Sequence, residues 1–113
     1  MAKNFTELLI WHKAKKITVD IYSIIKIKDY PFLDQIRKAS ISIMNNISEG
    51  FTRQNPKEFH YFLNIAKASA AEVLSMLYLA LDLKYINREN FTKLQSQIIE
   101  IIKILQKFKQ YLK

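Results

Sequence analysis

The chain has 113 residues, half of them hydrophobic and a quarter charged, with one glycine, two prolines and no cysteine. This composition suits a single globular domain over residues 1–113 and excludes two independent domains, a disulfide framework and a zinc site built on cysteine. A net charge of +8 favours polyanionic partners. So little glycine and proline leaves few tight turns for a sandwich or barrel, and we therefore expect an all-α domain.

Hydrophobic spacing predicts two helices in the first half of the chain. The first is expected over residues 6–26 and ends before Pro31, because proline disfavours helical backbone at the residue before it. The second is expected over residues 32–51. Its apolar stripe repeats every three or four residues, at Leu33, Ile36, Ser40, Ile43 and Ile47.

The third predicted helix has a clear start. Asn55 is placed to be its N-cap, with Pro56 at the first helical position and Glu58 at the third, a variant of the capping box. Asn87 is the expected cap of a fourth helix that continues to the C-terminus. A seven-residue apolar period and short connections predict a left-handed, antiparallel, up-down-up-down four-helix bundle.

The second and third predicted helices each carry an additional apolar stripe. In the second helix it consists of Ile41, Met44 and Phe51, and in the third of Leu63, Ala70, Leu74, Leu77 and Leu81. A monomeric bundle of this length is expected to cover only one wide face of each helix. The additional stripes therefore predict burial between subunits of a homo-oligomer.

The join between the second and third helices carries a characteristic sequence. It reads Asn46-Ile47-Ser48-Glu49-Gly50-Phe51, followed by Lys57-Glu58-Phe59 and then Ser69-Ala70-Ala71-Glu72. It resembles the four-helix-bundle family typified by proteins encoded in intervening sequences of bacterial 23S ribosomal RNA genes. That family also includes the accessory variability determinant of diversity-generating retroelements.

The resemblance covers nearly the whole chain and implies a non-enzymatic bundle. It also implies a ring-like homo-oligomer, typically a pentamer, that binds nucleic acid. One departure concerns Lys84, where the family often has glycine. A lysine there would cost about 1 kcal/mol if the backbone is left-handed.

Four polar residues are placed beside or among the apolar stripes and form a predicted structural polar set: Arg37, Asn46, Glu49 and Glu72. Because an unpaired buried charge is costly, we expect Arg37 to pair with Glu72, and Glu49 to pair with backbone amides or Arg53. The alternative is that the two glutamates form a catalytic pair. A structural role is favoured, because nothing else in the chain supplies a nucleophile or a cofactor.

We expect no enzyme activity, metal or cofactor. The only histidines, His12 and His60, lack a second ligand at metal-binding spacing on their own helices, and no glycine-rich phosphate loop is present. Only four apolar residues follow Glu7, too few for a signal peptide, and no uncharged run approaches the roughly 18 residues that span a bilayer. We therefore expect a cytoplasmic protein without a membrane partner.

The predicted topology gathers basic residues at one end of the bundle. The nucleic-acid-binding residues expected there are Lys13, Lys15, Lys16, Arg53, Lys57, Lys103, Lys107, Lys109 and Lys113, joined by Lys3. With fifteen lysines and three arginines, contacts to backbone phosphates are favoured over base readout, with RNA preferred to DNA. Two alternatives remain: a solvated surface that confers only solubility, and an assembly subunit for a partner protein such as a reverse transcriptase.

Overall fold

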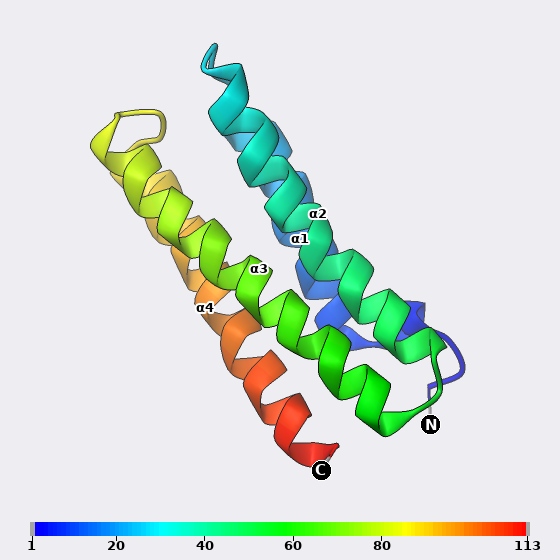
Figure 1. The fold of residues 1–113 in the computed structure, drawn as a ribbon. Coiled ribbons are helices and arrows are strands. Elements are labelled where there is room, and N and C mark those ends of the chain that lie inside the picture. Colours follow the sequence, from blue (N-terminus) through cyan, green and yellow to red (C-terminus); the bar gives the residue numbers. More distant parts are fainter. Residues whose placement is uncertain (1, 113) are drawn as a thin grey trace.

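The structure, a computed structural model, describes residues 2–112 as a bundle of four α-helices preceded by one short 3₁₀ helix. The elements are η1 (Phe5–Glu7), α1 (Leu9–Ile24), α2 (Tyr30–Thr52), α3 (Pro56–Asp82) and α4 (Arg88–Tyr111). Successive α-helices run in opposite directions, which confirms the predicted all-α up-down-up-down bundle (Figure 1). Each helix packs against two neighbours, and within residues 2–112 the diagonal pairs α1–α3 and α2–α4 make no close backbone contact.

The N-terminal boundary differs from the prediction. A helix was expected from Thr6, but η1 comes first and α1 begins only at Leu9. Asn4 causes this break, because its side-chain oxygen accepts a hydrogen bond from the Thr6 N–H at 2.9 Å and caps the short helix. Leu8 then adopts an extended backbone, with φ −86° and ψ 124°, before α1 starts.

Side-chain caps start the other three α-helices. Asp29 caps α2 from within the predicted break, so α2 begins two residues earlier than expected and carries Pro31 in its first turn. Asn55 accepts from the Glu58 N–H at 3.1 Å, and Asn87 accepts from the Asn90 N–H at 2.7 Å. The predicted starts of α3 and α4 are thereby confirmed.

The turn from α3 to α4 is a Schellman motif with Lys84 in the left-handed conformation, at φ 62°. The Lys84 N–H donates to the Leu81 carbonyl at 3.0 Å, and the Tyr85 N–H donates to the Ala80 carbonyl at 2.8 Å. The lysine therefore occupies a backbone position that favours glycine. The strain anticipated from the family comparison is present at this turn.

The two apolar stripes of α2 and α3 lie mostly inside their own subunit. Leu63, Ala70 and Leu77 are fully buried, and Met44 and Leu74 pack against the core while half-buried. The expectation that the additional stripes are buried between subunits is therefore wrong. Because each helix touches two neighbours, an apolar face two stripes wide is covered within one bundle.

The apolar side chains that remain exposed lie elsewhere. They are Tyr61, Tyr78 and Leu79 on α3, Leu83 at its C-cap, Tyr30 at the start of α2, and Leu9, Val19 and Tyr22 on α1. By length and composition alone α3 could also cross a membrane, with a mean hydropathy of 1.2 over 18 residues. Core helices of water-soluble proteins pass the same test, and the buried side of α3 belongs to the core of the bundle.

Candidate nucleic-acid interface

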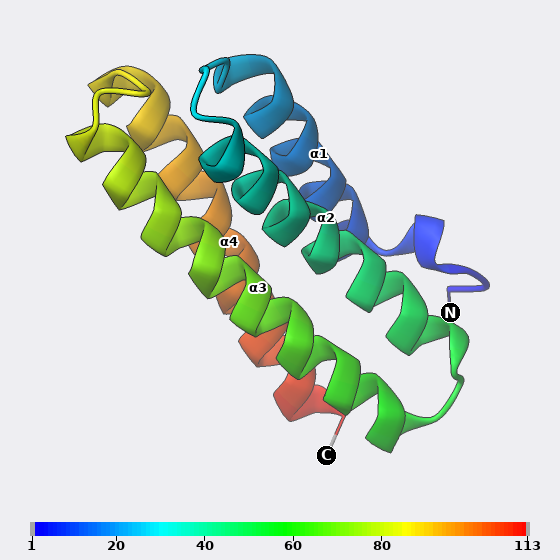
Figure 2. The ribbon, with the colours of Figure 1, turned by 45° about the horizontal axis from the view of Figure 1, so that its top comes forward.

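Three segments that are distant in sequence meet at one end of the bundle. They are the N-terminal residues before α1, the join between α2 and α3, and the last turns of α4 (Figures 1 and 2). Together they carry Lys3, Arg53, Lys57, Lys103, Lys107 and Lys109, which we call the basic end. The predicted site residue Lys113 lies outside the described residues.

Three lysines of the basic end have no anionic partner. Lys57 is exposed in the first turn of α3, and Lys103 and Lys107 are exposed one turn apart on α4. None of the three forms an ion pair or side-chain hydrogen bond with any residue in the 2–112 range. Their ammonium groups are therefore available to an external anion.

Arg53 is different, because its guanidinium is already neutralised. Its Nε donates to Glu49 Oε2 at 3.0 Å, and one terminal nitrogen lies 3.5 Å from Glu58 Oε1. The guanidinium also lies over the Phe62 ring, 5.1 Å from its centroid. The expected pairing of Glu49 with Arg53 is confirmed, and it ties the end of α2 to the start of α3.

The basic residues of α1 also have partners. Lys13 Nζ donates to Glu100 Oε1 on α4 at 3.0 Å, and Lys16 Nζ donates to Asp20 Oδ2 at 3.2 Å. Lys15 Nζ lies 5.6 Å from the centroid of the Trp11 ring. Lys13 and Lys16 therefore differ from Lys57, Lys103 and Lys107, which have no ion-pair partner among residues 2–112.

Asp20, whose side chain is mostly buried, is the centre of a polar network between α1 and α4. Besides Lys16, its Oδ2 accepts a hydrogen bond from Gln97 Nε2 at 2.9 Å and lies 3.9 Å from Lys93 Nζ. Burial by itself would raise the pKa of Asp20. The hydrogen bonds from Gln97 and Lys16 and the charges of Lys16 and Lys93 outweigh burial, so the pKa lies below its ordinary value.

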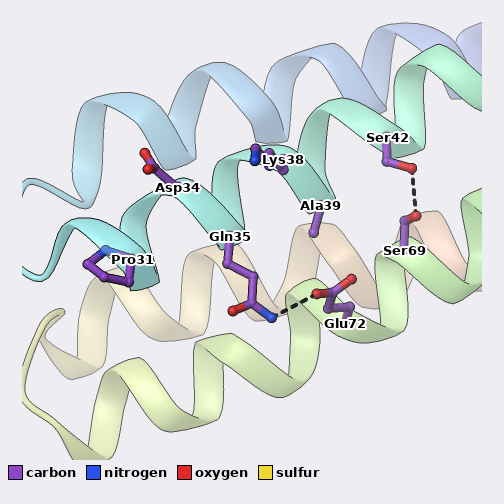
Figure 3. A pocket seen from close by; sticks show the side chains of 8 residues that line it. All are labelled: Pro31, Asp34, Gln35, Lys38, Ala39, Ser42, Ser69 and Glu72. Carbon is purple, nitrogen blue, oxygen red and sulfur yellow. Dashed lines mark hydrogen bonds between the residues drawn. The ribbon is translucent and has the colours of Figure 1, made fainter.

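The predicted pair of Arg37 with Glu72 is not formed. Glu72 instead accepts a hydrogen bond from Gln35 Nε2 at 3.1 Å (Figure 3). The Arg37 guanidinium stacks on the Tyr22 ring of α1 at 4.3 Å, and its buried Nε has no hydrogen-bond partner within the described chain. Residues two apart on a helix point about 200° apart, so Gln35 faces α3 while Arg37 faces α1.

The polar groove between α2 and α3 has a volume of about 370 Å³. Within it, the Ser42 and Ser69 hydroxyls lie 2.8 Å apart (Figure 3). One turn further along α2, Asn46 Nδ2 donates to the Ser42 carbonyl at 2.8 Å. The two glutamates considered as a catalytic pair are not brought together. Glu72 is level with Gln35, and Glu49 lies about 20 Å further along α2.

Neither histidine is part of a metal-binding cluster. His12 Nε2 is hydrogen-bonded to the Thr6 carbonyl at 2.6 Å, and His60 Nδ1 lies 3.5 Å from Asn64 Nδ2. Across residues 2–112, no three acidic or histidine side chains come close enough together to hold a metal ion.

An apolar cavity of about 330 Å³ opens in the basic end and was not predicted from the sequence. Its walls include Phe51, Pro56, Phe59 and Leu112, and its rim includes Lys3, Gln54 and Asn55. Phe51 was assigned to the additional stripe expected between subunits, and the helical spacing of Phe59 places it on a core face, so neither ring was predicted to line a cavity. The cavity forms because the N-terminal segment, the α2–α3 join and the end of α4 do not close completely over these rings.

The comparisons with known proteins agree with this architecture. The family described as 23S rRNA-intervening sequence protein matches residues 6–107 of the chain. The chain belongs to this family. The resemblance inferred from the α2–α3 join is thereby confirmed.

The family fold is also seen in a solved structure. A crystal structure of a protein with unknown function from the S23 ribosomal protein family of Bacteroides thetaiotaomicron is similar, with a TM-score of 0.82 and 27% sequence identity. The similarity covers 89% of this chain and 98% of that chain. No curated protein matches the sequence. Family membership therefore fixes the fold of the chain and leaves its ligand to be argued from the site.

Proposed function

We propose that this family member is a non-enzymatic module that binds RNA, or DNA, through the phosphates of the backbone. The observation that carries the proposal is the set of unpaired lysines Lys57, Lys103 and Lys107 at one end of the bundle. A lysine ammonium is a compact point charge that contacts phosphates without reading bases. The family's connection with 23S rRNA makes RNA the first ligand to test.

The proposal includes assembly into a homo-oligomer, with a pentamer as the expected form. The exposed apolar side chains Tyr61 and Leu79 on α3, and Leu83 at its C-cap, support a contact with a second copy of the chain. Ala68, Ala71 and Ser75 are also exposed on α3 and would allow a close approach of another helix. Assembly would repeat the basic end by symmetry and raise the avidity for a long polyanion.

The binding proposal is tested by the salt dependence of affinity for a single-stranded RNA. Affinity is expected to fall steeply between about 50 and 200 mM salt, because each neutralised phosphate releases counterions. Replacing Lys57, Lys103 and Lys107 with glutamine is expected to reduce the slope of log K against log salt by about 2. RNAs of unrelated sequence are expected to lose affinity by similar factors.

The matched control replaces three lysines at the opposite end, Lys26, Lys28 and Lys84, with glutamine, which gives the same change in net charge. This control protein is expected to keep most of its affinity. Equal losses in both triple variants would show that the charge acts diffusely. If the unmodified protein does not bind at 50 mM salt, a protein partner replaces nucleic acid as the ligand to seek.

Assembly is tested separately by light scattering at micromolar concentrations. A mass of 13.4 kDa would contradict the homo-oligomer. Leu79→Glu is expected to lower the mass by placing a charge in the proposed contact. Val19→Glu, which charges an equally exposed apolar position on α1, is expected to leave it unchanged.

A further inference from the structure

The apolar cavity in the basic end has the size and walls of a ligand site. Its volume of about 330 Å³ lies within the range of roughly 300–1,000 Å³ that is typical of small-molecule pockets. A smaller cavity of about 190 Å³ lies next to it and shares Lys3, Phe51 and Gln54 with it. The half-buried Phe51 ring therefore borders two openings at the same end of the bundle.

The aromatic wall of the cavity is held in place by other rings. Phe51 meets Phe59 edge-to-face at 6.0 Å between centroids, and Phe59 meets Phe108 at 5.1 Å. Rings fixed in this way lose little conformational entropy when a flat ligand packs against them. The wall is thus prepared to receive a planar, mostly apolar group.

The rim of the cavity adds amide groups with unused hydrogen-bonding capacity. Gln54 is held in the left-handed conformation, at φ 54°, and its side-chain amide has no partner within residues 2–112. Asn55 uses its Oδ1 to cap α3, which leaves its Nδ2 as a donor. Both side chains are exposed, so an acyl chain would gain no hydrogen bond from them, whereas the edge of a nucleobase would pair with them.

We propose that the cavity captures one unstacked base of a single-stranded nucleic acid, while the phosphates on either side contact Lys3, Lys57 and Lys107. This inference rests on the proposed function and adds a preference for single-stranded over double-stranded nucleic acid. A double helix keeps its bases stacked and paired and cannot place one against Phe51. Unstacked bases commonly pack on aromatic side chains, and every base has a face that can do so, so sequence preference remains weak.

The test compares three ligands with the same number of phosphates at 100 mM salt: a single strand of mixed sequence, a backbone of the same length without bases, and a duplex of half that length. The single strand with bases is expected to bind at least fivefold more tightly than the backbone without bases. Phe51→Leu is expected to remove most of this difference while keeping the cavity apolar. Phe108→Leu changes the same ring cluster outside the cavity and is the matched control for packing.

The outcomes separate the inference from the proposed function. If the strands with and without bases bind equally and both respond to salt, the base site is wrong and the phosphate site stands. If neither binds at 50 mM salt, the proposed function fails together with the inference. Because the first comparison uses the unmodified protein, equal binding with and without bases overturns the base site even if Phe51→Leu fails to fold.

Discussion

The Asp20 network gives the sharpest test of the packing of α1 against α4. In Asp20→Ala, Gln97 loses its hydrogen bond to a charged group, which is worth about 1.5–3 kcal/mol. Lys16 and Lys93 are more than half exposed, so their pairs add only about 0–1 kcal/mol each. We expect a loss of about 2–3 kcal/mol at pH 7, measured by urea denaturation followed through Trp11 fluorescence. Asp34→Ala removes an exposed carboxylate that forms no ion pair within residues 2–112, and it is expected to cost less than about 0.5 kcal/mol.

The pH dependence of the same variant has a defined sign. The pKa of Asp20 is lower in the folded protein than its ordinary value of 3.8. The contribution of the Asp20 carboxylate to the free energy of unfolding is therefore fully present above about pH 4. It is lost as the pH falls through the pKa that Asp20 has in the folded protein. The difference in the free energy of unfolding between the unmodified protein and Asp20→Ala is expected to be constant from pH 5 to 7 and to become smaller below pH 4. A difference that stays constant into strong acid would refute an ionic origin.

Four further substitutions test other parts of the fold, each measured by its urea midpoint. Gly50→Ala is expected to cost about 1–2 kcal/mol, because its Cβ would lie 2.8 Å from atoms of two α3 phenylalanines; a higher midpoint would contradict this close approach. Lys84→Gly is expected to gain up to about 1 kcal/mol by relieving left-handed strain, and a loss would show that lysine contacts hold the turn. Arg37→Met is expected to keep or raise stability, because the apolar stem can still cover Tyr22 and an unpartnered buried N–H is removed. Glu72→Ala is expected to cost less than about 1 kcal/mol. A loss of about 3 kcal/mol would instead indicate that Glu72 pairs with Arg37 in solution.

The sequence predicted the features of the fold that depend on local chemistry. The caps at Asn55 and Asn87 are short-range signals, because side chain and backbone partner lie three residues apart. The Glu49–Arg53 pair spans one turn of a single helix and was predicted for the same reason. Bundle topology followed from four apolar periods joined by short connections.

Features that depend on the rotation of one helix against another were not predicted. A charge on α2 can be placed beside an apolar stripe from the sequence, but which neighbour it faces depends on how the helix is turned. Arg37 was therefore assigned to α3, although it contacts Tyr22 on α1. The cavity was missed for a related reason, since it arises where three chain segments fail to close over Phe51.

A substitution at Lys57 distinguishes most clearly between a lysine that binds nucleic acid and a lysine that contributes only to the stability of the fold. A cation in the last turn of a helix, such as Lys109, is favoured by the helix dipole, so its presence needs no ligand. Lys57 stands in the first turn of α3, where the dipole disfavours a positive charge, and no acidic side chain of the described chain pairs with it. Lys57→Glu is therefore expected to stabilise the fold by about 0.3–1 kcal/mol and at the same time to weaken RNA binding. A solvated surface lysine would give the gain in stability without the loss of affinity, and that result would remove Lys57 from the proposed interface.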